Sequence, residues 1–211
     1  MNGFDRLAPM YDCLVRIVFG QSMVEAQTAF LHVVEQGSQV LILGGGTGWI
    51  LVELLNRQPE CEVWYVESSS RMIDIARKKC NHHHHRVYFI LGTEQSVPSR
   101  QFDVVIMNFF LDLFTEEHII HLLENVKRHT VLSGVWLITD FEHQGKWWQS
   151  QLLKAMILFF RVVCTIEARV LPDIKTILAS TGVRQRRGSS FFHGFITSGV
   201  YQAVTCTGSN R

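Results

Sequence analysis

A glycine-rich turn between a buried strand and a helix is the feature that most constrains this chain. The stretch VLILGGGTGWILVEL spans residues 40–54. Its first four residues form a continuous apolar run, typical of a strand buried on both faces, and residues 49–56 have helical spacing. Gly44, Gly46 and Gly48 let the backbone approach a ligand where a Cβ would clash. This order predicts either a site for a nucleotide-like ligand or a tight turn that needs glycine for geometry alone.

Short apolar strands alternate with amphipathic helices over residues 40–140. Strands are expected at 40–43, 63–66, 87–91, 102–107 and 135–139, and helices at 49–56, 68–79 and 116–129. The alternation implies right-handed crossovers and a parallel sheet with helices on both faces. The alternation ends after residue 141. A long apolar helix (147–165), a short helix (172–180) and two strands (183–192 and 195–204) are expected there, the strands as a hairpin at the sheet edge.

These patterns predict one α/β domain over residues 1–211, with a doubly wound, mostly parallel seven-stranded sheet and an antiparallel C-terminal hairpin. Residues 1–36 are expected to form a helical N-terminal segment, broken at Gly20, with Ser22 capping its second helix. Residues 40–140 would form the cofactor-binding core. Residues 141–211 would supply the substrate-side helix and the hairpin.

An acidic residue ends the second predicted strand. Glu67 follows the apolar run VWYV and lies 19 positions after Gly48. A carboxylate at that place can accept two hydrogen bonds from the hydroxyls of a ribose. The alternative is an exposed glutamate that caps the following helix. Together with the glycine turn, Glu67 favours a ligand that contains a nucleoside.

These motifs resemble the class I S-adenosylmethionine-dependent methyltransferases. The turn is similar to that family's V-L-D/E-x-G-x-G-x-G loop, and the stretch ESSSRMIDIAR (67–77) is similar to its D/E-x-S-x-x-M-L…A pattern. The opening FDRLAPMYD (4–12) resembles the F-D-x-x-A-x-x-Y-D opening of the quinone-biosynthesis branch. The resemblance implies a Rossmann-like methyltransferase fold, S-adenosyl-L-methionine as cofactor, and methyl transfer to a small, apolar or aromatic acceptor.

The resemblance also implies where the cofactor would lie. The glycine loop would lie against its methionine part, the end of the second strand against the ribose, and the start of the next helix against the adenine. The segment after the third strand would meet the adenine amino group, the segment after the fourth strand would close the methionine end, and the N-terminal lid would cover the cofactor. The implied contact residues are Tyr11, Gly44, Gly45, Gly46, Thr47, Gly48, Glu67, Ser68, Met72, Thr93, Glu94, Asn108 and Phe109.

The chain departs from the family pattern at two places. Ile42 replaces the acidic residue usual in the first strand, which removes a polar contact near the methionine amino group. The segment 108–112 (NFFLD) stands where the family often has a histidine. The turn is also similar to that of spermidine synthases, which bind decarboxylated S-adenosylmethionine. Thr47 stands where those enzymes usually carry an acidic residue, so it favours methyl transfer. Aminopropyl transfer and a non-catalytic cofactor-binding or dimerisation module are the alternatives.

Catalysis of methyl transfer needs little besides alignment. A sulfonium methyl is already activated, and the protein mainly holds nucleophile, carbon and sulfur in line. A base helps where the acceptor is a hydroxyl or a protonated amine. Asp112, Glu142 and His143 follow strand ends, where doubly wound sheets place their sites, and are the candidates for that base.

The remaining features restrict the partners and the compartment. Lys plus Arg total 20 and Asp plus Glu total 19, so no basic excess points to nucleic acid. Five scattered cysteines without a C-x-x-C spacing indicate a reducing compartment rather than disulfides or zinc. With no signal-peptide core and no apolar run long enough to span a bilayer, a cytoplasmic protein is expected.

Two side-chain clusters have more than one interpretation. The run His82–His85 could bind a transition metal, but an exposed loop after a helix is the favoured interpretation, and no metal site is predicted. The apolar helix that starts at Trp147 would pack in the core, line an apolar substrate pocket or form a homodimer surface. The basic run 184–187 (RQRR) is expected to be the solvated face of an edge strand.

Overall fold

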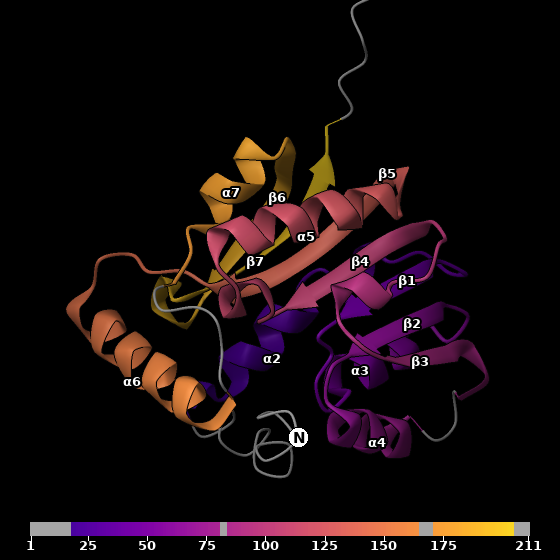
Figure 1. The fold of residues 1–211 in the computed structure, drawn as a ribbon, viewed down its shortest axis with the longest axis horizontal. Helices are drawn as coiled ribbons and strands as arrows, with labels where there is room; N and C mark the ends of the chain where they lie inside the picture. The colour runs from indigo at the N-terminus through magenta and orange to yellow at the C-terminus, as the bar shows by residue number, and fades with distance from the viewer. Residues whose placement is uncertain (1–17, 81–83, 165–170, 205–211) are drawn as a thin grey trace, which may run out of the picture.

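The computed structural model describes residues 18–80, 84–164 and 171–204. Its strands form one sheet in the order β3-β2-β1-β4-β5-β7-β6 (Figure 1). The strands are β1 (Gln39–Leu43), β2 (Glu62–Glu67), β3 (Val87–Leu91), β4 (Phe102–Asn108), β5 (Thr130–Phe141), β6 (Val183–Phe191) and β7 (Ile196–Ala203). The predicted doubly wound, mostly parallel sheet of seven strands is confirmed.

The last two strands do not both lie at the edge of the sheet. Strand β7 pairs antiparallel with β5 on one side and with β6 on the other, so of these two strands β6 alone lies at an edge. The side chains explain this order, because most of β7 is buried whereas β6, with its run RQRRGSS, is exposed along nearly its whole length. An apolar strand gains most from an inner position, and a charged strand tolerates the edge.

Helices cover both faces of the sheet (Figure 1). The helices are α2 (Gln21–Thr28), α3 (Trp49–Arg57), α4 (Ser70–Lys79), α5 (Glu116–Arg128), α6 (Trp147–Cys164) and α7 (Ile174–Ser180). One buried apolar cluster joins the sheet to α3 and α4, and a second joins its other face to α5 and α7. A third cluster, at the end of the sheet, includes residues of α2 and α6.

Helix α5 shows how sequence and local structure agree. Thr115 accepts a hydrogen bond from the backbone N–H of His118 at 3.4 Å, which caps the first turn. Acidic residues in that turn and basic residues in the last turn complement the helix dipole. Four residues at helical spacing (Ile119, Leu122, Leu123 and Val126) are buried against the sheet.

The structure corrects several predicted boundaries. The N-cap of α2 is Gly20, so Ser22 lies in the first turn and caps nothing, and the helix ends at Thr28 rather than near residue 36. Helix α4 begins at Ser70 because Ser69 is its N-cap and accepts from Met72 N. Strand β5 is longer than predicted, since a register shift opposite β4 allows pairing to begin at Thr130.

Helix α6 lies apart from the main layers, at one end of the molecule (Figure 1). Its inner residues Trp148, Leu152 and Leu153 pack against the third cluster, whereas Trp147 is 78% exposed and Leu158 is 64% exposed. Both core packing and an exposed apolar face therefore occur on one helix. Among the described helices, none combines the length and the apolar character that crossing a membrane requires.

Candidate functional site

The glycine turn, the end of β2 and the end of β4 meet at the carboxyl edge of the sheet. Strand β1 lies between β2 and β4, and the chain crosses from β3 back over β2 and β1 to reach β4. Crevices at such a reversal of strand order are where open α/β sheets bind ligands. The residues around this crevice therefore form the candidate site.

The glycines of the turn are required for different structural reasons. A Cβ on Gly44 would clash with the ring of Phe110, one on Gly45 with the ring of Tyr65, and one on Gly48 would come within 2.6 Å of the Ala76 Cβ. Those three glycines are required by packing.

Gly46 is different because its neighbourhood is open. It has a φ of +62°, and among the described residues a Cβ there would meet only the Met72 sulfur, at 3.9 Å. Backbone in this left-handed region favours glycine even where space is free. Gly46 therefore presents bare backbone to the crevice, as close contact with a ligand requires.

Glu67 connects the end of β2 to the glycine turn. Its Oε2 accepts from the backbone N–H of Gly46 at 3.0 Å, and its Oε1 accepts from the backbone N–H of Ser69 at 2.9 Å. The side chain is buried, and burial raises its pKa while these N–H donors oppose the rise. A carboxylate has about four acceptor positions, so Oε2, which accepts from Gly46 alone among the described residues, keeps capacity for a hydroxyl donor. The alternative of an exposed capping glutamate is wrong, because the N-cap of α4 is Ser69.

Other predicted cofactor residues lie around this pair. Thr47 is buried and accepts a hydrogen bond from Lys79 Nζ at 3.1 Å, which ties the turn to the last turn of α4. Met72 is buried in the first turns of α4, close to Gly46. Ser68 is exposed, and its hydroxyl lies 3.4 Å from Glu67 Oε1.

The segment after β3 is held by α5. Thr93 is exposed and caps the short turn η3 (Glu94–Ser96). Glu94 is buried, with its Oε1 at 3.2 Å from His118 Nε2, and its backbone oxygen accepts from Asn125 Nδ2 at 2.9 Å. The Glu94 carboxylate is thus engaged by α5, which leaves Thr93 as the better-placed side chain for a polar contact with an adenine. That role stays a prediction.

The end of β4 carries an unsatisfied donor. Asn108 Nδ2 is buried and has no hydrogen-bond partner among the described residues. Buried amide groups without a partner are rare in proteins, so this nitrogen marks a place where a ligand acceptor fits. The next residue, Phe109, has a φ of +50°, and its ring packs 4.8 Å from that of Phe141. Such a strained residue at the mouth of a crevice is typical of a functional site.

A pair of buried carboxyl groups lies beside this segment. Asp140 Oδ2 accepts from the backbone N–H groups of Leu111 and Asp112 at 3.1 and 3.3 Å, and its Oδ1 accepts from Phe141 N at 2.9 Å. A hydrogen bond joins the side chains of Asp112 and Asp140. Burial raises the pKa of Asp112 to about 7, and burial together with the Asp112 charge raises that of Asp140. The two carboxyls therefore share a proton near neutral pH.

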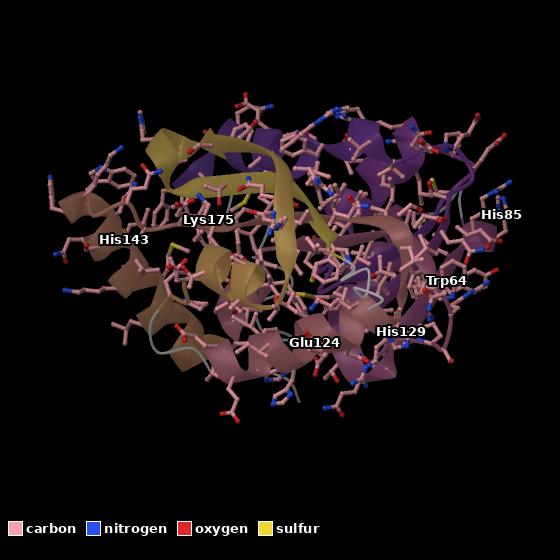
Figure 2. The ribbon with its side chains drawn as sticks, turned by 90° about the horizontal axis from the view of Figure 1, so that it is seen from above. Trp64, His85, Glu124, His129, His143 and Lys175 are labelled. Atoms are coloured by element: carbon pink, nitrogen blue, oxygen red, sulfur yellow. The ribbon has the colours of Figure 1, made fainter. Side chains whose placement is uncertain are left out.

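The structure does not bring the three predicted base candidates together. Asp112 pairs with Asp140, Glu142 pairs with Lys175 at 2.6 Å, and the exposed His143 lies 2.8 Å from Ser150 Oγ. Glu142, His143 and Lys175 line a cavity of about 260 Å³ that also includes Asp140 in its wall. Figure 2 shows His143 and Lys175 toward one end of the molecule and His85 at the opposite end.

Asp140 and Tyr65 were missed by the sequence predictions. Asp140 gave the same signal as its neighbours, an acidic residue close to a strand end. Tyr65 gave none, because a tyrosine within an apolar run indicates only a buried strand.

Several other predictions have a structural outcome. Ile42 is buried in the apolar cluster under α3, so its position has no polar partner to offer. Tyr11 and the lid segment 1–17 lie outside the described residues, as do His82 and His83. His85 is exposed, and the described part of the chain contains no group of His, Cys, Asp or Glu suited to a metal ion.

The site fits an S-adenosylmethionine-like molecule by its own chemistry. The open backbone at Gly46 gives room for close approach. The spare acceptor positions of Glu67 match ribose hydroxyls, and Asn108 Nδ2 matches a carboxylate or carbonyl oxygen. These groups lie on three different loops of one crevice.

Comparison with known proteins gives a domain match and a shared fold. Residues 40–134 match a family described as a methyltransferase domain. The mitomycin 7-O-methyltransferase MmcR has a TM-score of 0.71 at 16% identity, over 95% of this chain and 60% of that one. The structure of DhpI with S-adenosylhomocysteine has the same TM-score and identity, over 96% of this chain and 94% of that one. The chain has the class I methyltransferase fold.

A sequence relative is consistent with that class. A demethylmenaquinone methyltransferase of Thermotoga maritima is 32% identical over 120 residues. The matched region is 55% of this chain and 51% of that protein, so the chain spans only about half the length of this curated relative. The chain therefore has a methyltransferase-like fold and a stretch, residues 40–134, that matches a methyltransferase domain.

Proposed function

We propose that the protein binds S-adenosyl-L-methionine in the crevice between the glycine turn, Glu67 and Asn108, and transfers its methyl group to a small acceptor. The observation that carries this proposal is the buried Glu67 carboxylate, which is fixed by Gly46 N and Ser69 N and keeps acceptor capacity on Oε2. Neighbouring proteins of the same fold support it, since one was solved with S-adenosylhomocysteine and another is named as an O-methyltransferase.

Different residues of the site would bind different parts of the cofactor. Glu67 would hold the ribose hydroxyls, and the open backbone at Gly46 would lie along the methionine part. Asn108 Nδ2 would donate to the methionine carboxylate, which would satisfy a donor that otherwise stays buried without a partner. The bound cofactor supplies an activated sulfonium methyl, and the protein contributes alignment of the acceptor with it.

The cavity beside Asp140 is the proposed acceptor pocket. Its volume of about 260 Å³ suits a small molecule, and its wall combines apolar residues with the Asp140 and Glu142 carboxyls. An acceptor hydroxyl or amine would find hydrogen-bond acceptors there. Because Asp112 and Asp140 share a proton, this pair can also take up a proton that an acceptor releases.

The direct test is calorimetric titration of S-adenosylhomocysteine into wild type, Glu67→Gln and the control Glu62→Gln. Glu62 begins the same strand and belongs to none of the contacts of the crevice. We expect Glu67→Gln to weaken binding about 10- to 100-fold, since hydrogen bonds to charged groups contribute about 1.5–3 kcal/mol. Absence of binding to the wild type, or equal binding by both variants, would overturn the proposal.

Aminopropyl transfer is distinguished by a second titration. The unpartnered Asn108 Nδ2 favours a cofactor that carries a carboxylate. S-adenosylmethionine should therefore bind more tightly than its decarboxylated form, and the reverse order would favour aminopropyl transfer.

We also propose a cytoplasmic location. Cys61 and Cys80 are buried free thiols, which fits a reducing compartment. Thiol titration of protein purified without reductant tests this, because a disulfide-linked product would contradict it.

A further inference from the structure

We propose that Tyr65 is a positioning residue that fixes Gly46 for the methionine end of the cofactor. The inference rests on the proposed function, because it assigns a role within the same crevice. It concerns a side chain buried beneath the glycine turn, which the cofactor itself would not touch.

Tyr65 and Glu67 hold the two backbone polar groups of Gly46. The Tyr65 hydroxyl donates to Gly46 O at 2.7 Å, and Glu67 Oε2 accepts from Gly46 N at 3.0 Å. The two side chains are two positions apart on β2, so they lie on the same face of the strand. Side chains of strand β2 therefore bind both the N–H and the carbonyl oxygen of one residue in the neighbouring turn.

The Tyr65 ring is itself fixed. It is completely buried, occupies the space where a Cβ of Gly45 would lie, and packs 5.3 Å from the ring of Phe89 on β3. A rigid ring held in a close-packed core keeps its hydroxyl at one point. The hydroxyl can thus restrict the conformation of the turn.

Gly46 needs this restriction because a glycine backbone adopts more conformations than that of any other residue. Its φ of +62° is one of several regions that glycine adopts readily, and no side chain limits it. With both polar groups held, the turn is already in one conformation before a ligand arrives. Preorganisation of this kind reduces the entropy lost on binding.

The expected consequence differs between the two halves of the cofactor. Glu67, which would hold the ribose, has a second anchor in Ser69 N at 2.9 Å, and this anchor remains when the Tyr65 hydroxyl is lost. The methionine part would lie along the turn that Tyr65 fixes. Loss of the hydroxyl should therefore weaken recognition of the methionine part and largely spare the nucleoside.

The experiment compares two ligands on the variant Tyr65→Phe. S-adenosylhomocysteine contains both halves, whereas 5′-methylthioadenosine lacks the amino and carboxylate groups. We expect Tyr65→Phe to weaken S-adenosylhomocysteine about 5- to 10-fold, in the range of one lost neutral hydrogen bond, and 5′-methylthioadenosine less than about 2-fold. Tyr88→Phe, which removes a half-exposed hydroxyl from β3, is the matched control and should change neither affinity.

Hydrogen exchange separates positioning from general destabilisation. In Tyr65→Phe the amides of residues 44–48 should exchange faster, while those in the centre of β2 keep the wild-type rate. Equal weakening of both ligands, or faster exchange throughout β2, would show a merely structural role and overturn the inference, as would unchanged binding of both ligands. Failure of the wild type to bind either ligand would instead refute the proposed function.

Discussion

Replacing Asp112 by asparagine should make the protein more stable than the wild type above neutral pH. In the wild type, Asp112 and Asp140 are buried side by side, and the Asp112 Oδ1 atom has no hydrogen-bond partner in the described part of the chain. When both carboxyls are ionised, two like charges share one buried site. An asparagine of nearly the same shape would instead donate its amide N–H to the fixed Asp140 carboxylate.

The size of the effect follows from the pKa of Asp112, which burial raises from 3.8 to about 7. Between these values the folded protein holds a proton that the unfolded chain has released, so the free energy of unfolding falls as pH rises across this window. The loss is absent below about pH 4 and complete above about pH 7. At about 1.36 kcal/mol per pKa unit it amounts to about 4 kcal/mol, an upper limit because the two carboxyls titrate as a pair.

Urea denaturation at a series of pH values from 4 to 9 measures this effect. Wild type should lose stability between about pH 4 and 7, and Asp112→Asn should lose less over the same interval, since burial still raises the pKa of Asp140. Asp103→Asn is the control, since the Asp103 carboxylate accepts from Gln39 N at 2.8 Å in an exposed position far from the pair. Parallel stability curves for wild type and Asp112→Asn would refute the reasoning about a shared proton.

Two further predictions concern the crevice. Gly45→Ala should reduce the free energy of unfolding by about 1–3 kcal/mol, because its Cβ would displace the packed Tyr65 ring. Gly37→Ala, at φ +76° with open space, should reduce it by only about 1–2 kcal/mol, from backbone strain. Denaturant melts that rank the two variants in the opposite order would contradict this. Asn108→Leu should raise the melting temperature, because it removes a buried donor that has no partner among the described residues. The same variant should bind S-adenosylhomocysteine more weakly in calorimetry. A less stable variant with unchanged binding would contradict both expectations.

Much of the core could be predicted because its signals are local. Continuous apolar runs marked β1 to β4, and strand β3 was predicted with its observed bounds, Val87–Leu91. Glu67 could be singled out because an acidic residue directly after such a run must lie at the carboxyl edge of the sheet. Its hydrogen bond to Gly46, 21 positions away, depends on the pairing of β1 with β2 and has no local signal.

The incorrect predictions concern strand boundaries and long-range contacts, which local sequence patterns do not determine. The sequence pattern predicts that the fifth strand ends at Thr139, whereas the strand continues to Phe141, directly before Glu142 and His143. Asp140 lies within the strand, and its carboxylate accepts from the backbone N–H groups of residues 111 and 112, in the short turn that follows β4. The order of β6 and β7 was also beyond local pattern, because both were expected at the edge and only burial of β7 distinguishes them.

The position of β7 has a consequence for biosynthesis. Strand β5 ends at Phe141, but its antiparallel partner begins only at Ile196, so the nascent chain must emerge by more than 50 further residues before that side of β5 is paired. Until then, the open side of an apolar strand can pair with other chains. Residues that precede β7, including the charged strand β6, cannot take their places first, because β7 separates them from β5. Completion of the sheet is thus a late, long-range event, and ribosome-bound chains that stop short of residue 196 should be the aggregation-prone species.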